Sequence, residues 1–129
     1  MGEIRSYRDL KVWSRAMDLA QGIYDLTNGF PKREEYRLSS QMVRAAISIP
    51  ANIAEGSMRT TRKDYAYFVS IAQGSTAELE TLLLLAGRAK FDSQVSIAGL
   101  LKQAEEVGRM LRGLRERLSD KHKSLEPRT

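Results

Sequence analysis

The chain has 129 residues, a formal net charge of +5 and no cysteine. The absence of cysteine excludes disulfides and thiolate metal sites, and no apolar run approaches the roughly 18 residues of a membrane span. The first ten residues include four charged side chains, Glu3, Arg5, Arg8 and Asp9, and contain no apolar core of a signal peptide. We therefore expect one domain, residues 1–129, in the cytoplasm, with no membrane partner.

Three breaks divide the chain: residues 28–31 with Gly29 and Pro31, residues 56–60, and residues 91–93. None of the segments between them shows the two-residue alternation of strands. Asp92 or Ser93 is a candidate N-cap for the last segment. The sequence predicts four helices, near 8–28, 32–56, 61–90 and 93–119, followed by a polar tail over 120–129.

The first predicted helix, 8–28, carries apolar residues over an arc of about 200°, from Leu10 and Val12 to Tyr24 and Leu26. An ordinary surface helix needs an apolar stripe of little more than about 100°. This helix therefore has more apolar surface than one bundle core requires.

The second predicted helix, 32–56, contains Pro50, which removes a backbone donor and predicts a kink. Gln41 and Asn52 lie at the edge of its apolar arc, and Glu55 lies on its polar side. These three residues could form a binding constellation. We favour a structural role, in which they fix helix register or a subunit contact.

The third predicted helix, 61–90, opens with Thr61 and Asp64, a pattern similar to a capping box. Its second half contains four consecutive leucines, which point about 100° apart and cannot all face one core. The sequence predicts that they contribute to an oligomer interface: Leu82, Leu83, Leu84 and Leu85.

The fourth predicted helix, 93–119, is amphipathic, with basic residues continuing toward the C-terminus. A second basic group surrounds the start of the third helix. Both groups are candidate nucleic-acid-binding residues: Arg59, Arg62 and Lys63, and Arg109, Arg112 and Arg115. A solvated charged surface is the alternative interpretation of both.

Four helices of matched length with short connections predict an all-α, antiparallel up-down-up-down four-helix bundle. Symmetric self-association would bury the excess apolar arcs of the first three helices.

Catalytic and metal-binding patterns are missing from the sequence. The single histidine, His122, lies in the predicted tail, and Glu55, Glu78 and Glu80 have no histidine three residues further on, as di-iron bundles require. Neither a Ser-His-Asp set nor a glycine-rich phosphate loop can be assembled. We expect no cofactor and no enzymatic activity.

Several stretches resemble the bacterial 23S rRNA intervening-sequence proteins, and the most specific of them ends in Asn-Ile-Ala-Glu-Gly at residues 52–56. The matching stretches are residues 10–13, 30–31, 36–38, 41, 44–56 and 71–80. The resemblance implies a four-helix bundle that assembles into a ring-like homopentamer, and no enzymatic activity. It also implies kinship with accessory proteins of diversity-generating retroelements, which bind nucleic acid and a reverse transcriptase.

Two functions remain open at this point. The chain could be an oligomeric module that binds the RNA or DNA backbone as an accessory or ribonucleoprotein component. It could instead be a protein-binding scaffold whose basic surface is incidental. Arg62 and Lys63 favour the first function, because cations in the first turn oppose the helix dipole and backbone N–H groups there can bind a phosphate.

Overall fold

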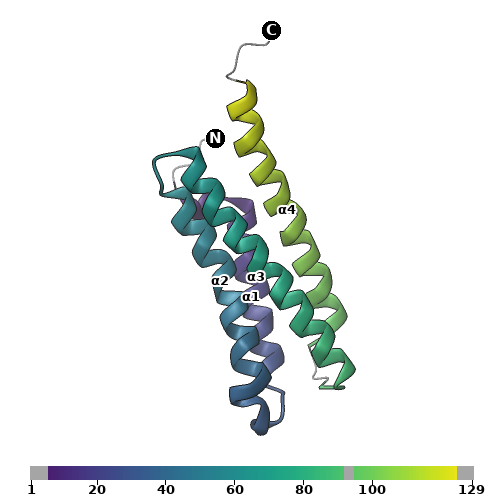
Figure 1. Ribbon diagram of the computed structural model, residues 1–129. Helices are drawn as coiled ribbons and strands as arrows, with labels where there is room; N and C mark the ends of the chain where they lie inside the picture. Colours follow the sequence, from purple (N-terminus) through teal and green to yellow (C-terminus); the bar gives the residue numbers. More distant parts are fainter. Residues whose placement is uncertain (1–5, 92–94, 125–129) are drawn as a thin grey trace.

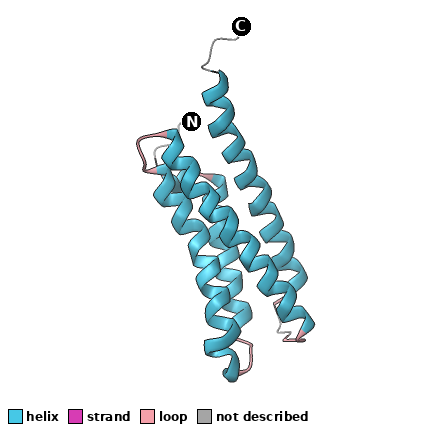
Figure 2. Cartoon of the chain, viewed as in Figure 1, coloured by secondary structure: helices cyan, strands magenta, loops and turns pink. Residues whose placement is uncertain are grey.

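The computed structural model describes residues 6–91 and 95–124, with side chains as far as Ser119. Within these ranges every regular element is helical and no strand occurs (Figure 2). The four α-helices, labelled in Figure 1, are α1 (Lys11–Thr27), α2 (Ser40–Ser57), α3 (Arg62–Arg88) and α4 (Ile97–Ser124). The predicted all-α class with four helices is confirmed.

The first helix starts three residues later than predicted, because a separate turn precedes it. Tyr7–Asp9 form a 3-10 helix (η1) that Ser6 caps: the Arg8 N–H donates to Ser6 Oγ at 3.1 Å, and the Ser6 N–H donates to Asp9 Oδ2 at 3.3 Å. Leu10 is extended at φ −78° and ψ 125°, so α1 begins only at Lys11.

The predicted second helix, 32–56, is divided into three elements. A 3-10 turn (η2, Lys32–Glu34) and a π-helical turn (η3, Glu35–Ser39) precede α2. Pro50 is buried inside α2, and the helix continues beyond it to Ser57.

Both ends of α3 are closed by local hydrogen bonds. The Thr61 hydroxyl accepts a bond from the Asp64 N–H at 3.1 Å, which confirms the predicted cap. At the other end Lys90 adopts φ 61°, and the Phe91 N–H donates to the Ala86 carbonyl oxygen at 3.1 Å. This 6→1 bond is that of a Schellman motif, and it turns Phe91 back onto Phe30, whose ring centroid lies 5.5 Å away.

The fourth helix begins and ends later than predicted. Ser96 caps it, since its hydroxyl accepts a bond from the Gly99 N–H at 3.0 Å; the candidate caps Asp92 and Ser93 lie outside the described residues. The helix runs to Ser124, so residues 120–124 continue it and do not form a tail. Figure 1 shows the C-terminal part of α4 extending past the other helices, at the same end as the N-terminus.

Close contacts define how the helices pack. Near the middle of α2 and α3, Ser48 lies against Ser75, while Gly56 at the end of α2 lies against Tyr65 and Phe68 near the start of α3. Arg15 of α1 pairs with Glu106 of α4 at 2.8 Å. The core between the helices contains large side chains that are completely buried: Leu19, Ile23, Leu26, Met42, Ile49, Ile53, Leu79, Leu83 and Leu111.

Candidate nucleic-acid interface

The basic group at the start of α3 is partly neutralised within the subunit. Arg59 pairs with Glu55, with Nη2 2.6 Å from Oε2, and its guanidinium lies 4.7 Å from the centroid of the Phe68 ring. Arg62 is half-buried, and Lys63 is exposed. Of the three predicted residues in the described part of the chain, therefore, only Lys63 is both exposed and without an ionic partner.

The basic group on α4 is less neutralised within the subunit than the group at the start of α3. Arg109, Arg112 and Arg115 are all exposed, and in the described part of the chain none has a carboxylate oxygen within 4.0 Å. Arg109 and Arg112 line a groove between α3 and α4, and Arg115 Nη1 donates to Gln73 Oε1 at 3.3 Å. This bond leaves the charge of Arg115 without a counterion.

The α3–α4 groove also contains acidic groups. Glu80 and Glu105 line it together with Gln73 and Thr76. The two carboxylates lie on the side of the groove nearer the start of α4. The cationic surface therefore extends from Arg109 toward the C-terminal part of the helix.

Two further cations join this surface from elements distant in sequence. Lys11 at the start of α1 and Arg117 of α4 line a second groove, together with Arg109 and the apolar side chains of Leu10, Val12, Met110 and Leu114. Arg117 follows Arg109 by two helical turns and belongs to the basic run along the fourth helix that the sequence already shows. The position of Lys11 depends on the packing of α1 against α4, which no local pattern encodes.

Arg117 also acts on a tyrosine of the neighbouring helix. Burial raises the pKa of the Tyr65 hydroxyl above its usual value of 10.0, and the nearby charge of Arg117 partly opposes this increase. The phenol is therefore neutral at physiological pH. Tyr65 and Phe68 are half-buried and only Tyr67 is well exposed, so two of the three aromatic residues near the start of α3 pack inward.

Of the three residues with a predicted structural role, Asn52 takes part in a contact between two helices, while Glu55 and Gln41 make local contacts. The Asn52 side-chain amide donates to the Ser48 carbonyl oxygen at 2.8 Å and to the Ser48 hydroxyl at 3.0 Å, and that hydroxyl contacts Ser75 of α3. Glu55 pairs with Arg59 of the next turn. Gln41 is exposed and donates to the Arg37 carbonyl oxygen at 2.9 Å within its own segment.

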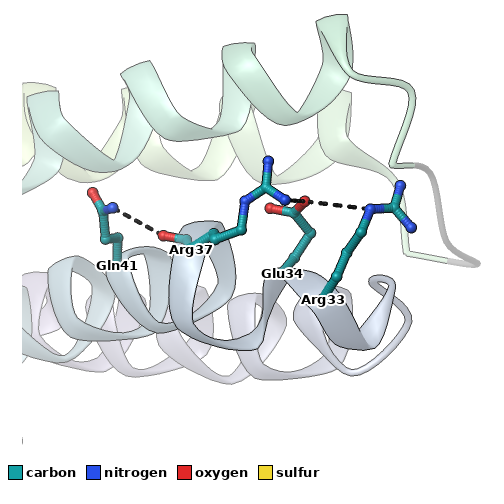
Figure 3. Close-up of polar contacts among 4 residues, drawn as sticks. All are labelled: Arg33, Glu34, Arg37 and Gln41. Atoms are coloured by element: carbon teal, nitrogen blue, oxygen red, sulfur yellow. Dashed lines mark hydrogen bonds and ion pairs between the residues drawn. The ribbon is translucent and has the colours of Figure 1, made fainter.

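Sequence reasoning missed one buried carboxylate, that of Glu34 (Figure 3). Its residue is 4% exposed, and one oxygen lies 3.6 Å from Arg37 Nη1 and 3.9 Å from Arg33 Nε. The Arg33 guanidinium also lies 5.9 Å from the centre of the Phe91 ring. These contacts tie the η2 and η3 turns to the end of α3, a structural role.

The four consecutive leucines divide into two pairs. Leu82 and Leu83 are buried in the core of the subunit, so an interface with another chain has no access to them. Leu84 and Leu85 are 58% and 51% exposed. The reason is the helical rotation of about 100° per residue, which turns two of four successive side chains outward.

The described residues contain no group of three or more His, Asp or Glu side chains placed to hold a metal ion. In the same part of the chain, no helix is both long enough and apolar enough to cross a membrane.

The fold and this surface define a small helical protein that combines exposed apolar side chains with an arginine-rich fourth helix. Residues 8–113 match the family model of the 23S rRNA-intervening sequence proteins, and the chain belongs to that family. The fold is similar to the crystal structure of a protein of unknown function from the S23 ribosomal protein family of Bacteroides thetaiotaomicron. The two chains are 23% identical with a TM-score of 0.74, over 81% of this chain and 95% of that one. A search of curated proteins found no significant match.

Proposed function

We propose that this protein is a non-enzymatic, oligomeric module that binds the backbone of RNA or DNA through the arginines of α4. In this proposal the subunit is an up-down-up-down bundle, and several copies present the same basic surface. Repeated copies would allow individually weak contacts to act together.

One observation carries the proposal: the three exposed guanidinium groups of Arg109, Arg112 and Arg115 lack a carboxylate partner within the described residues. They lie beside α3, since Arg109 and Arg112 line the groove between α3 and α4 and Arg115 donates to Gln73 of α3. An exposed arginine without a counterion is free to bind phosphate, often with two parallel hydrogen bonds. The group at the start of α3 is the weaker candidate, because Arg59 is already paired with Glu55.

The chemistry of these residues favours binding without sequence preference. Guanidinium groups on an exposed helix contact phosphates, whereas sequence is read by groups that reach the edges of bases. Affinity should therefore fall steeply with salt, with a log–log slope near −0.7 for each phosphate neutralised on a single strand.

The test is fluorescence anisotropy with a labelled single-stranded RNA of mixed sequence over a series of salt concentrations. Replacing Arg109, Arg112 and Arg115 with serine should flatten the salt slope by about two units, which corresponds to three lost phosphate contacts. The matched control replaces Arg59, Arg62 and Lys63 with serine. It removes the same charge and should change the slope less.

Equal flattening by both triple variants would show that net charge, and not the α4 surface, governs binding. Failure of the unmodified protein to bind at about 50 mM salt, where electrostatic contacts are strongest, would reject the proposal.

A protein-binding scaffold is the second candidate, and a different observation favours it. Large apolar side chains are exposed on α1 and α2, among them Met17, Ile47 and Met58 at 45%, 44% and 70%. Exposed apolar patches of this kind mark protein interaction sites.

A further inference from the structure

The outer side of α3 is almost free of charge. From Tyr65 to Gly87 its exposed residues are Tyr67, Gly74, Ala77, Glu78, Thr81, Leu84, Leu85 and Gly87, and only Glu78 is charged. We call this surface the α3 face. A helix side that remains in water is normally rich in charged residues, so the composition of the α3 face is that of a buried contact.

A second apolar surface lies along the groove between α1 and α2. Tyr24 of α1 and Val43 of α2 line one end of it, and Met58 lines a hollow with Ala51 and Ala54 toward the other end. Helical spacing places Met17 and Ile47 between these ends, seven residues from Tyr24 and four from Val43. We call this surface the α1–α2 face.

The two faces also differ in shape at one level along the helix axes. Gly74 has no side chain, and a Cβ atom added there would meet nothing within 4 Å, so the space above this point of the α3 face is open. Ile47, which projects from the α1–α2 face, and Gly74 each immediately precede a member of the contacting pair Ser48 and Ser75. A projecting side chain on one face therefore lies level with an open position without a side chain on the other.

Charge is complementary at two heights. Glu78 follows Ser75 by three residues and Arg44 precedes Ser48 by four, so a rise of 1.5 Å per residue puts them at nearly the same level. By the same count, Arg88 follows Ser75 by thirteen residues and Glu35 precedes Ser48 by thirteen.

All four side chains are exposed, and within the described ranges none has an oppositely charged group within 4.0 Å. At the first level α3 carries the negative charge of Glu78 and α2 the positive charge of Arg44. At the second level the signs are reversed, with Arg88 on α3 and Glu35 on η3. A copy placed alongside another at the same height would therefore bring opposite charges together at both levels.

We propose that the α3 face of one copy packs against the α1–α2 face of the next, with Glu78 facing Arg44 and Arg88 facing Glu35. Because the two faces differ, the contact is heterologous, and repeating it generates a ring or an open array. This inference deepens the oligomeric part of the proposed function and does not require nucleic-acid binding.

Charge reversal tests the proposal with light scattering at micromolar protein. Arg44→Glu and Glu78→Arg should each reduce the assembly toward the 14.6 kDa monomer, since each variant places like charges opposite one another in every contact. An equimolar mixture of the two variants should again form complexes larger than the monomer, because an interface between unlike variants joins opposite charges. Pairing within one subunit could not be restored by mixing.

Two further variants separate assembly from folding. Gly74→Leu adds a side chain at the open position of the α3 face, so it should prevent assembly while circular dichroism stays helical, as the added side chain meets open space in the subunit. Lys102→Glu reverses an exposed charge on α4, away from both faces, and should leave the mass unchanged.

Four outcomes would overturn the inference: a monomeric unmodified protein, unchanged mass of the single reversals, an unchanged mass of Gly74→Leu, or a mixture that stays monomeric. An assembly that recovers on mixing but binds no RNA would reject the proposed function and leave the interface standing.

Discussion

The hydroxyl oxygens of Ser48 and Ser75 lie 2.7 Å apart, one on α2 and the other on α3. Asn52 extends this contact by donating its side-chain amide to the Ser48 hydroxyl. The three half-buried polar groups satisfy one another between two helices and so fix the register of α2 against α3.

Removing one hydroxyl should therefore cost stability and reveal the coupling between the helices. Ser75→Ala and Ser48→Ala should each lower the free energy of unfolding by about 1 kcal/mol, and the double variant should cost less than the sum of the two. Denaturant unfolding at one protein concentration measures this. Ser57→Ala is the control, because its hydroxyl bonds only to the Ala54 carbonyl oxygen of its own helix. Strict additivity of the two changes would contradict the coupling.

Gly56 lies at a close approach between α2 and α3. A Cβ atom there would lie 2.8 Å from the Phe68 Cβ and 3.2 Å from the Tyr65 carbonyl oxygen, and a backbone atom cannot move aside. Gly56→Ala should therefore destabilise the protein by about 1–3 kcal/mol, measured as a lower midpoint of denaturant unfolding.

The matched control for Gly56 is Gly108→Ala on α4. Its nearest contact would be the Thr76 Cγ2 at 3.8 Å, an ordinary van der Waals distance. This change should stabilise the helix by about 0.5–1 kcal/mol, because alanine loses less backbone entropy than glycine. The same sign for both substitutions would show that backbone propensity, and not the close approach, determines the result.

Lys90 occupies the left-handed conformation that ends α3, at φ 61°. Glycine adopts this conformation without the Cβ clash that costs other residues roughly 1–2 kcal/mol, although it loses more chain entropy on folding. Lys90→Gly should raise the midpoint of thermal unfolding, and Lys90→Val should lower it because a β-branched residue tolerates positive φ poorly. Equal midpoints for the two variants would show that the left-handed conformation of Lys90 costs no stability.

Tyr65 should make stability depend on alkaline pH. Burial raises the pKa of its hydroxyl above 10.0, so the folded state holds the proton more tightly than the unfolded chain does. The stabilisation from this group is fully present below pH 10.0 and is lost as the pH rises through the higher folded value. Thermal unfolding across this range should decline less steeply for Tyr65→Phe than for the unmodified protein.

Arg117 provides the complementary test for Tyr65. Its positive charge favours the phenolate, so Arg117→Ser should move the pKa of Tyr65 still higher. Absorbance titration of the tyrosinate, with Tyr65→Phe as the reference, measures the change. A lower pKa in Arg117→Ser would contradict the placement of Arg117 beside this ring.

Local sequence determined the helices, because helical periodicity and capping depend on residues a few positions apart. The Thr61 cap and the four amphipathic segments were predicted for that reason. The starts of α1 and α4 differ from the prediction. They too depend on nearby residues, but there several side chains compete to accept the first backbone hydrogen bonds. Ser6 caps a separate turn before α1, and Ser96 takes the role expected of Asp92 or Ser93.

The surface was decided by tertiary structure. The leucine run showed that some of its members must point outward, but only the packing of α3 against its neighbours selects Leu84 and Leu85 for exposure and buries Leu82 and Leu83. Likewise, the local basic pattern marked Arg59, whose neutralisation depends on the rotamers that bring it to Glu55 and Phe68. Lys11 joins Arg109 and Arg117 only because α1 and α4 pack together, a contact between residues about one hundred positions apart that no local periodicity contains.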